Sequence, residues 1–379
     1  MTDAANGAGV VFRAPIFGGS GYADTSVGVL LALDAAGIPV QTMPLGEQED
    51  SKKLLPHDVR RKLEAMRHNR LDLSRSVFFQ SCPGGDLDLT MRGRAQIGHT
   101  TFETDRLPDG WAERCQAMDE VWFPASFFGD VLARAGVEDS KMRVMGRGLD
   151  ADLYRPDATP LEIPQTRGFN FLSVFDWHDR KAPDLLLRAY LTEFRADEDV
   201  ALIVKTYQIN SGTMDLEAEI AEFIERRMGM TLEQTPPIIL LNGFLPNVEM
   251  PRLYAAANAF VLPTRGEGFG PFMEPMACGC PVIATRWSGQ LDYLNDENSF
   301  LVDLDGVVPV PSDVDIEMFA GHCWAAPSLD HLRKQMREVF ENPTETKRRA
   351  ERGCREIREQ FNWTTVGRRW TSEFQRLLG

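Results

Sequence analysis

The sequence predicts an α/β protein with two doubly wound, Rossmann-like domains that face a central cleft. Strand-like and helix-like segments alternate along almost the whole chain, which is typical of parallel sheets covered by helices. The chain has 379 residues, more than one hydrophobic core usually serves. The stretch 155–165 contains prolines and no hydrophobic periodicity, so it reads as a linker. We therefore expect an N-terminal domain over residues 1–160 and a C-terminal domain over residues 166–360.

The N-terminal domain opens with a β–α–β unit. Gly7–Phe17 reads as a strand, a glycine-rich turn follows at 18–21, and the apolar pattern predicts a helix over Thr25–Ala36. Gly37 can end this helix, and the next strand follows over Ile38–Met43. The remaining expected elements are the strands Ser76–Gln80, Ala95–Gly98, Glu120–Pro124 and Met142–Met145 and the helix Ser126–Ala135.

The C-terminal domain repeats this alternation. Its strands are short and carry Val, Ile, Leu and Phe on both faces, as strands of a buried parallel sheet do. We expect them at Asn170–Phe175, Val200–Thr206, Ile238–Leu241, Ala259–Pro263 and Pro281–Thr285. The expected helices are Pro183–Glu193, Asp215–Arg227, Glu249–Ala257 and a charged helical tail over Leu329–Leu378.

Composition and charge exclude several classes of protein. The chain has 41 Lys and Arg against 56 Asp and Glu, and the net charge of −15 argues against nonspecific nucleic-acid binding. Val27–Ala36 is among the longest apolar runs and contains Asp34, so we expect no membrane span. The N-terminus has no basic segment followed by an apolar core, and the six cysteines are scattered. We expect a cytoplasmic protein with reduced thiols, and peripheral contact with the inner membrane face stays open.

The densest chemical signal is Val261–Leu294, which reads as strand, glycine-rich loop, short helix and strand. The loop runs Gly266, Glu267, Gly268, Phe269 and Gly270. Its backbone N–H groups can approach a ligand, and the helix that begins near Pro271 or Pro275 offers partial positive charge to a phosphate. Glu267 and Glu274 would repel a diphosphate, so we expect them to face sugar or ribose hydroxyls.

This segment resembles the retaining glycosyltransferases of family 4, which have the two-domain fold called GT-B. Their motif is Glu-x7-Glu followed by A-M-A-x-G-x-P-V-I, whereas this chain has E-G-F-G-P-F-M-E followed by P-M-A-C-G-C-P-V-I. One residue is missing between the glutamates, and Pro275 replaces the usual alanine. The resemblance implies that Glu267 lies near the donor sugar and Glu274 near the ribose. The shorter spacing affects the expected position of Glu267 more than that of Glu274.

A second segment, Phe171–Tyr190, resembles the family's strand, basic loop and Lys-Gly pair before a helix. Lys181 takes the lysine place, and Ala182 replaces the glycine. The family's upstream arginine is absent here, and Arg180 or Lys205 is a candidate to compensate. A leaving nucleoside diphosphate gains negative charge, so nearby cations would stabilise it. The alternative is that these are solvated loop charges.

A third segment, Ile239–Tyr254, resembles the family's strand and glycine turn where the nucleobase docks on backbone groups. Gly243, Phe244 and Leu245 are the candidates, and Phe244 can equally be a core residue.

In the N-terminal domain, the resemblance implies that the loop with Gly19 and Gly21 contacts the donor phosphate or the acceptor. This loop does not match the dinucleotide fingerprint G-x-G-x-x-G. His99 follows a strand and is a candidate to hydrogen-bond the sugar or acceptor, or else a structural histidine. His178 reads more readily as a loop histidine than as a ligand. By the same resemblance, Trp363–Leu378 crosses back to pack on the first domain.

The preferred function is retaining transfer of a hexosyl group from a UDP- or GDP-sugar to a growing glycan, a glycolipid or a small metabolite. Glu267, Lys181 and His99 are the catalytic candidates, and neither a cofactor nor a metal is expected. Asp86-Leu-Asp88 and Asp303-Leu-Asp305 have the spelling of a metal motif but read as loop carboxylates.

Other functions stay open. A missing residue between the glutamates and the absent upstream arginine are compatible with a catalytically inactive GT-B scaffold that binds a partner. A sugar-nucleotide epimerase of the same fold is a further alternative. The sequence names neither the sugar, the nucleobase, the acceptor nor the oligomeric state.

Overall fold

The computed structural model describes residues 7–46, 55–207, 215–312, 314 and 317–379. The chain divides into two compact units: Met1–Ala151 with Glu359–Gly379, and Asp152–Arg358. The boundary therefore lies ahead of the predicted linker, because residues 155–165 pack as part of the second unit. Leu161 N–H donates to Arg252 O at 2.9 Å, and Arg358 donates to Tyr154 O at 2.5 Å.

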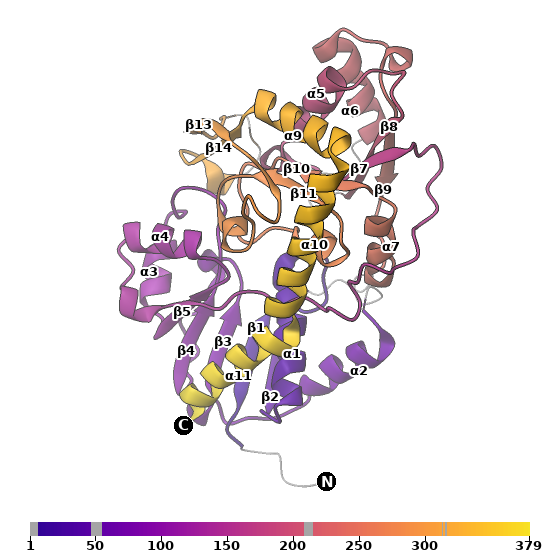
Figure 1. Ribbon diagram of the computed structural model, residues 1–379. Helices are drawn as coiled ribbons and strands as arrows, with labels where there is room; N and C mark the ends of the chain where they lie inside the picture. The colour runs from indigo at the N-terminus through magenta and orange to yellow at the C-terminus, as the bar shows by residue number, and fades with distance from the viewer. Residues whose placement is uncertain (1–6, 47–54, 208–214, 313, 315–316) are drawn as a thin grey trace. The chain divides into compact units, whose positions relative to one another are not determined.

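Unit 1 is a six-stranded parallel sheet in the order β2-β1-β3-β4-β5-β6 (Figure 1). Its strands are β1 Val10–Ala14, β2 Val40–Pro44, β3 Val77–Ser81, β4 Ala95–His99, β5 Glu120–Phe123 and β6 Met142–Val144. Its helices are α1 Gly21–Ala35, α2 His57–Met66, α3 Trp111–Gln116, α4 Ser126–Arg134 and α11 Trp363–Leu378. Helices α1 and α11 run side by side.

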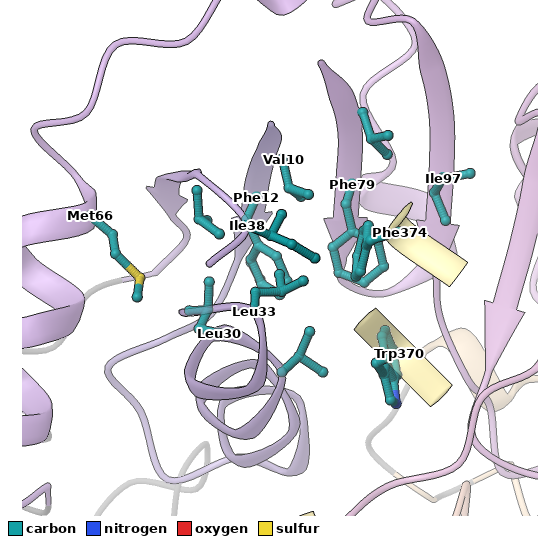
Figure 2. Close-up of a cluster of buried hydrophobic side chains, with 14 of the residues drawn as sticks. Val10, Phe12, Leu30, Leu33, Ile38, Met66, Phe79, Ile97, Trp370 and Phe374 are labelled. Atoms are coloured by element: carbon teal, nitrogen blue, oxygen red, sulfur yellow. The ribbon is translucent and has the colours of Figure 1, made fainter. Parts of the chain in front are cut away.

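The core of unit 1 is completed by the last helix of the chain. Trp370 and Phe374, one turn apart on α11, are both fully buried. Both side chains lie beside Phe79 (Figure 2), and their ring centroids are 5.9 and 5.3 Å from that of Phe79. The Trp370 indole N–H donates to Gly146 O at 3.2 Å, so its polar atom is satisfied. The C-terminal helix therefore returns to the first domain, as the resemblance implied.

Unit 2 is a six-stranded parallel sheet in the order β12-β11-β10-β7-β8-β9. Its strands are β7 Phe169–Asp176, β8 Val200–Tyr207, β9 Ile238–Asn242, β10 Ala259–Leu262, β11 Val282–Thr285 and β12 Phe300–Val302. An antiparallel hairpin adds β13 Leu304–Pro309 and β14 Cys323–Pro327. The helices are α5 Pro183–Glu193, α6 Leu216–Glu222, α7 Met250–Ala255, α8 Met273–Ala277, α9 Leu329–Glu341 and α10 Pro343–Gln360. In the parts of the chain that the structure describes, no helix is long and apolar enough to cross a membrane.

The strand orders place one switch point in each sheet. In unit 2, strands β7, β8 and β9 extend to one side and β10, β11 and β12 to the other, so the order reverses between β7 and β10. In unit 1 it reverses between β1 and β3. Ligands of open α/β sheets bind at the carboxyl ends of the strands at such points. A ligand site is therefore expected at the loops after β7 and β10.

Packing of α1 against α11 gives a test of the fold. A β-carbon at Gly28, inside α1, would overlap the indole of Trp363. We expect Gly28→Ala to lower the free energy of unfolding by about 1–3 kcal/mol, although alanine favours a helix by about 1 kcal/mol. Urea denaturation measures the change.

Gly21→Ala is the matched control, because a β-carbon at Gly21, in the same helix, meets nothing within 4 Å. We expect this variant to be as stable as the wild type or more stable. Equal midpoints for the two variants would contradict the tight contact between α1 and α11.

Candidate functional site

The loop after β10 fixes Glu267 from several sides. Its side chain is only 7% exposed, and the Thr264 hydroxyl donates to Oε1 at 2.8 Å. Its backbone N–H donates to Ser288 Oγ at 2.8 Å, and its carbonyl accepts from Gly289 N–H at 3.0 Å. Ser288 and Gly289 follow β11, so the ends of two neighbouring strands hold the main chain and the side chain of this one residue.

The turn after β7 brings two cations to the same carboxylate. Asp179–Lys181 forms a single 3-10 turn between β7 and α5. Lys181 Nζ lies 2.5 Å from Glu267 Oε1, and an Arg180 Nη lies 3.3 Å from Oε2. Arg180 also donates to Gly266 O at 2.5 Å. We call Arg180, Lys181 and Glu267 the charge cluster. It lies at the switch point of unit 2 and carries a formal net charge of +1.

The charge cluster keeps Glu267 ionised. Burial alone would raise the pKa of Glu267, but the adjacent Lys181 and Arg180 outweigh it and hold the pKa at about 2. Burial, with the same two cations, lowers the pKa of His178 to about 3, so its imidazole is neutral. Glu267 is therefore an anion at neutral pH and has no proton to give as a general acid.

Two residues other than glycine have left-handed backbone angles beside the charge cluster. Ala182, directly after Lys181, has φ +56°, and Ser288, which accepts from Glu267 N–H, has φ +71°. Such conformations cost about 1–3 kcal/mol each and persist only where surrounding contacts enforce them. The resemblance had identified Ala182 as a place where the family has glycine, and the backbone keeps the shape that glycine favours.

Lys205 lies at the end of β8, apart from the charge cluster in sequence. Its side chain is buried, its Nζ donates to Gly243 O, and it lies 5.8 Å from the ring centroid of Tyr207. Burial lowers its pKa to about 8. Phe244 is 55% exposed and stacks on Tyr207 with centroids 5.0 Å apart, so its interpretation as a core residue is wrong. Leu245 is half-buried.

The rest of the glycine loop is anchored by Tyr293. Its hydroxyl donates to Phe269 O at 2.8 Å, and its ring packs on the buried Phe269 ring at 4.8 Å. Gly270 has φ +89°. A β-carbon at Gly289 would overlap Gly268 O, so the loops after β10 and β11 touch backbone to backbone.

Glu274 is buried in α8, a helix of five residues, with Pro275 in its first turn and Pro271 ahead of it. Glu267 is in the loop and Glu274 in the helix. Five of the six residues between them, 268–272, therefore belong to the loop.

The remaining candidates lie in unit 1. Gly19 is exposed in the loop between β1 and α1, and Gly21 is exposed as the first residue of α1, which Ser20 caps by accepting from Ala23 N–H. His99 ends β4 and is only 3% exposed, with Nδ1 2.8 Å from Ser81 Oγ. Its centroid lies 5.4 Å from that of Trp370, and burial lowers its pKa to about 3. His99 is therefore a neutral, packed histidine, and its contact with a sugar stays a prediction.

Both Asp-Leu-Asp stretches make structural contacts. Asp303 accepts from Arg286 at 2.8 Å, and Asp88 accepts from the backbone and hydroxyl of Thr90 at 2.7 Å. Over the described residues, no group of three His, Cys, Asp or Glu side chains is arranged to hold a metal ion.

The sequence analysis missed three residues that shape the site. Thr264 and Ser288 both bind Glu267, and Arg265 joins its loop to the turn after β7. All three lie within three residues of the end of β10 or β11. Their places at carboxyl ends of buried strands were the signal that was available in the sequence.

Comparison with known proteins relates the segment that contains the charge cluster to glycosyltransferases. Residues 167–310 match the family model described as glycosyl transferases group 1. The D-inositol 3-phosphate glycosyltransferase of Thermobifida fusca is 33% identical over 182 residues, which is 46% of this chain and 40% of that protein. The chain spans 17–52% of the length of the curated relatives it matches.

Solved structures match nearly the whole chain. A glycosyltransferase from Rickettsia africae has a TM-score of 0.71 at 13% identity, covering 98% of this chain and 99% of that chain. HepE of Anabaena in complex with UDP-glucose has a TM-score of 0.67 at 13% identity, covering 97% and 99%. Residues 167–310 therefore form a group 1 glycosyltransferase domain, in a chain that has the GT-B fold.

Proposed function

We propose that the protein is a retaining glycosyltransferase of family 4 type that moves a hexosyl group from a UDP- or GDP-sugar to a hydroxyl acceptor without a metal. The observation that carries this is the charge cluster, two cations held at the switch point of the group 1 domain. The relationship to a glycosyltransferase acting on D-inositol 3-phosphate and the similarity to HepE bound to UDP-glucose support a nucleotide-sugar donor.

The chemistry needs stabilisation of a leaving group. The bond between the anomeric carbon and the diphosphate oxygen breaks, and a bond to the acceptor oxygen forms on the same face of the sugar. The acceptor proton passes to the departing diphosphate. One cation 4 Å from the developing charge contributes roughly 4 kcal/mol at an effective dielectric of 20, before desolvation. In this proposal Lys181 and Arg180 supply that charge.

Glu267 has a different role from that of a proton donor. In the structure it orders Lys181 and Arg180, and we propose that it also accepts a hydrogen bond from a hydroxyl of the donor sugar. Glu274 would bind the ribose. Lys205, with the exposed Phe244 and the carbonyl-lined turn at Gly243, would hold the nucleotide.

The acceptor is proposed to meet unit 1. Gly21, the first residue of α1, has open space where a β-carbon would be, which suits a helix start that approaches a ligand. A growing glycan, a glycolipid or a small metabolite fits this proposal, and His99 would contact the sugar or acceptor. The place of action would be the cytoplasm, including the inner membrane face.

An inactive scaffold is the second candidate, because one observation favours it. Lys181 is already paired with Glu267 at 2.5 Å, and a scaffold would keep that pair unchanged when nucleotide is added. A transferase must share Lys181 with the diphosphate.

Removing the lysine separates the two functions. We expect Lys181→Ala to lower nucleoside diphosphate release from UDP-glucose or GDP-mannose by about 100-fold or more, because one stabilising cation is lost. The assay is run with and without EDTA, and wild-type release should persist with EDTA. Lys347→Ala is the control, since Lys347 is 77% exposed on α10, where it pairs with Glu351 at 3.7 Å. If thermal shift finds no binding of any UDP-, GDP- or ADP-sugar to the wild type, the proposed function is wrong.

Lys205 gives the donor site a pH dependence. Its pKa of about 8, lowered by burial, means that the amine is charged below this pH and neutral above it. We expect UDP affinity, measured by calorimetry, to fall as pH rises through about 8. Lys205→Arg should flatten this fall, because a guanidinium stays charged. A flat profile in the wild type would place Lys205 out of reach of the diphosphate.

A further inference from the structure

Arg265 connects three segments around the charge cluster. Its Nε donates to Asp179 O at 3.2 Å, and its Nη2 lies 3.3 Å from Asp184 Oδ1. Its backbone N–H donates to Arg180 O at 2.7 Å. Thus both the main chain and the side chain of Arg265 bind the turn that carries Arg180 and Lys181.

Arg265 is itself fixed by the hairpin β13–β14. Its carbonyl accepts from Ala325 N–H at 2.9 Å, and its guanidinium lies 5.5 Å from the ring centroid of Trp324. Trp324 is only 2% exposed, so this ring cannot move easily. A guanidinium over an indole face gains cation–π attraction as well as packing. Arg265 is therefore a rigid support, with a side chain only 19% exposed.

The turn that Arg265 binds needs support. It ends at Ala182 with φ +56°, and Pro183 follows, which further restricts the residue before it. Alanine in a left-handed conformation is strained, because its β-carbon crowds the following carbonyl oxygen, and this strain favours a different path for the turn. Hydrogen bonds to Asp179 O and Arg180 O oppose any such change, because they bind the turn immediately before Ala182.

We propose that Arg265 is a positioning residue, which holds the strained turn 179–182 so that Lys181 faces Glu267 and the donor diphosphate. The part that concerns the diphosphate rests on the proposed function, whereas the part that concerns Lys181 and Glu267 does not. Arg265 itself touches neither the carboxylate of Glu267 nor, in this proposal, the substrate.

The first experiment measures the turn without any substrate. Lys181 Nζ is buried in an ion pair, so its acetylation by an N-hydroxysuccinimide ester should be slow. We expect Arg265→Ala to speed acetylation of Lys181 roughly tenfold, since it removes the side chain's charge-assisted hydrogen bonds to the turn. Peptide mass spectrometry gives the rate, with exposed Lys347 as the internal reference.

Arg286→Ala is the matched control. Arg286 follows β11 as Arg265 follows β10, and it pairs with Asp296 and Asp303 away from the turn. Its removal should leave the Lys181 rate unchanged. If Arg265→Ala does not fold, Arg265→Lys serves instead, because it keeps a cation near Asp184 but lacks the planar fork that reaches Asp179 O as well.

The second experiment tests whether backbone strain at Ala182 is the reason that the turn needs Arg265. Glycine at position 182 removes the left-handed penalty, so Ala182→Gly added to Arg265→Ala should return the Lys181 rate and the turnover toward wild type. A residue with a merely structural role would not be rescued in this way. An unchanged Lys181 rate in Arg265→Ala, or no rescue by Ala182→Gly, would overturn the proposal.

The two proposals fail separately. If the wild type binds no nucleotide sugar but Arg265→Ala still exposes Lys181, the proposed function is wrong and Arg265 still positions the turn. If the wild type is active and Arg265→Ala keeps both its turnover and its slow Lys181 labelling, the positioning role is wrong.

Discussion

The ion pair between Lys181 and the buried Glu267 is the constraint on which the rest of the C-terminal unit depends. The two residues are 86 positions apart and meet because β7 and β10 are adjacent parallel strands whose ends share an edge. A buried carboxylate without its partner would be strongly destabilising, so the two loops have little freedom to move apart. The Thr264 hydroxyl adds a hydrogen bond to the carboxylate, and Ser288 Oγ holds the Glu267 main chain by accepting from its N–H. The same arrangement leaves one unit of positive charge in excess, in a chain of net charge −15.

Much of the fold could be predicted, and the reasons are visible in particular elements. Helix α5 has the expected bounds because Pro183 fixes its first turn, and β8 was found because nearly all its residues are buried. Strand β13 alternates between half-buried and exposed residues and was missed, as were the three residues of β12. Helix α2 is highly polar and has only Leu63 and Met66 buried, so its apolar pattern is too weak to stand out.

Less of the site could be predicted, because residue type does not determine a partner. The sequence indicated cations for a diphosphate and a glutamate for hydroxyls, but it could not show that Lys181 and Glu267 bind each other. The two residues are far apart in the sequence, and they meet because the strand order makes β7 and β10 neighbours. Phe244 is a second case in which residue type does not determine the surroundings. It is an apolar ring next to a glycine, and nothing in the sequence indicated that it would stack on Tyr207 and stay exposed to solvent. Arg265 was passed over because its bonds to the turn end on the backbone carbonyls of Asp179 and Arg180, which the residue types in the sequence do not indicate.

The return of α11 to unit 1 has a consequence for biosynthesis. Trp370 and Phe374, with Val366 of the same helix, belong to a core whose other buried members come from the first 145 residues, yet 207 residues of unit 2 separate the two parts. At about 5–20 residues per second, the ribosome needs roughly 10–40 s to make that interval. During this time the nascent first unit carries an uncovered apolar surface over Phe79 and Trp122. The order of synthesis therefore makes unit 2 the first part able to complete its own core, and the N-terminal half of the chain the last to finish folding.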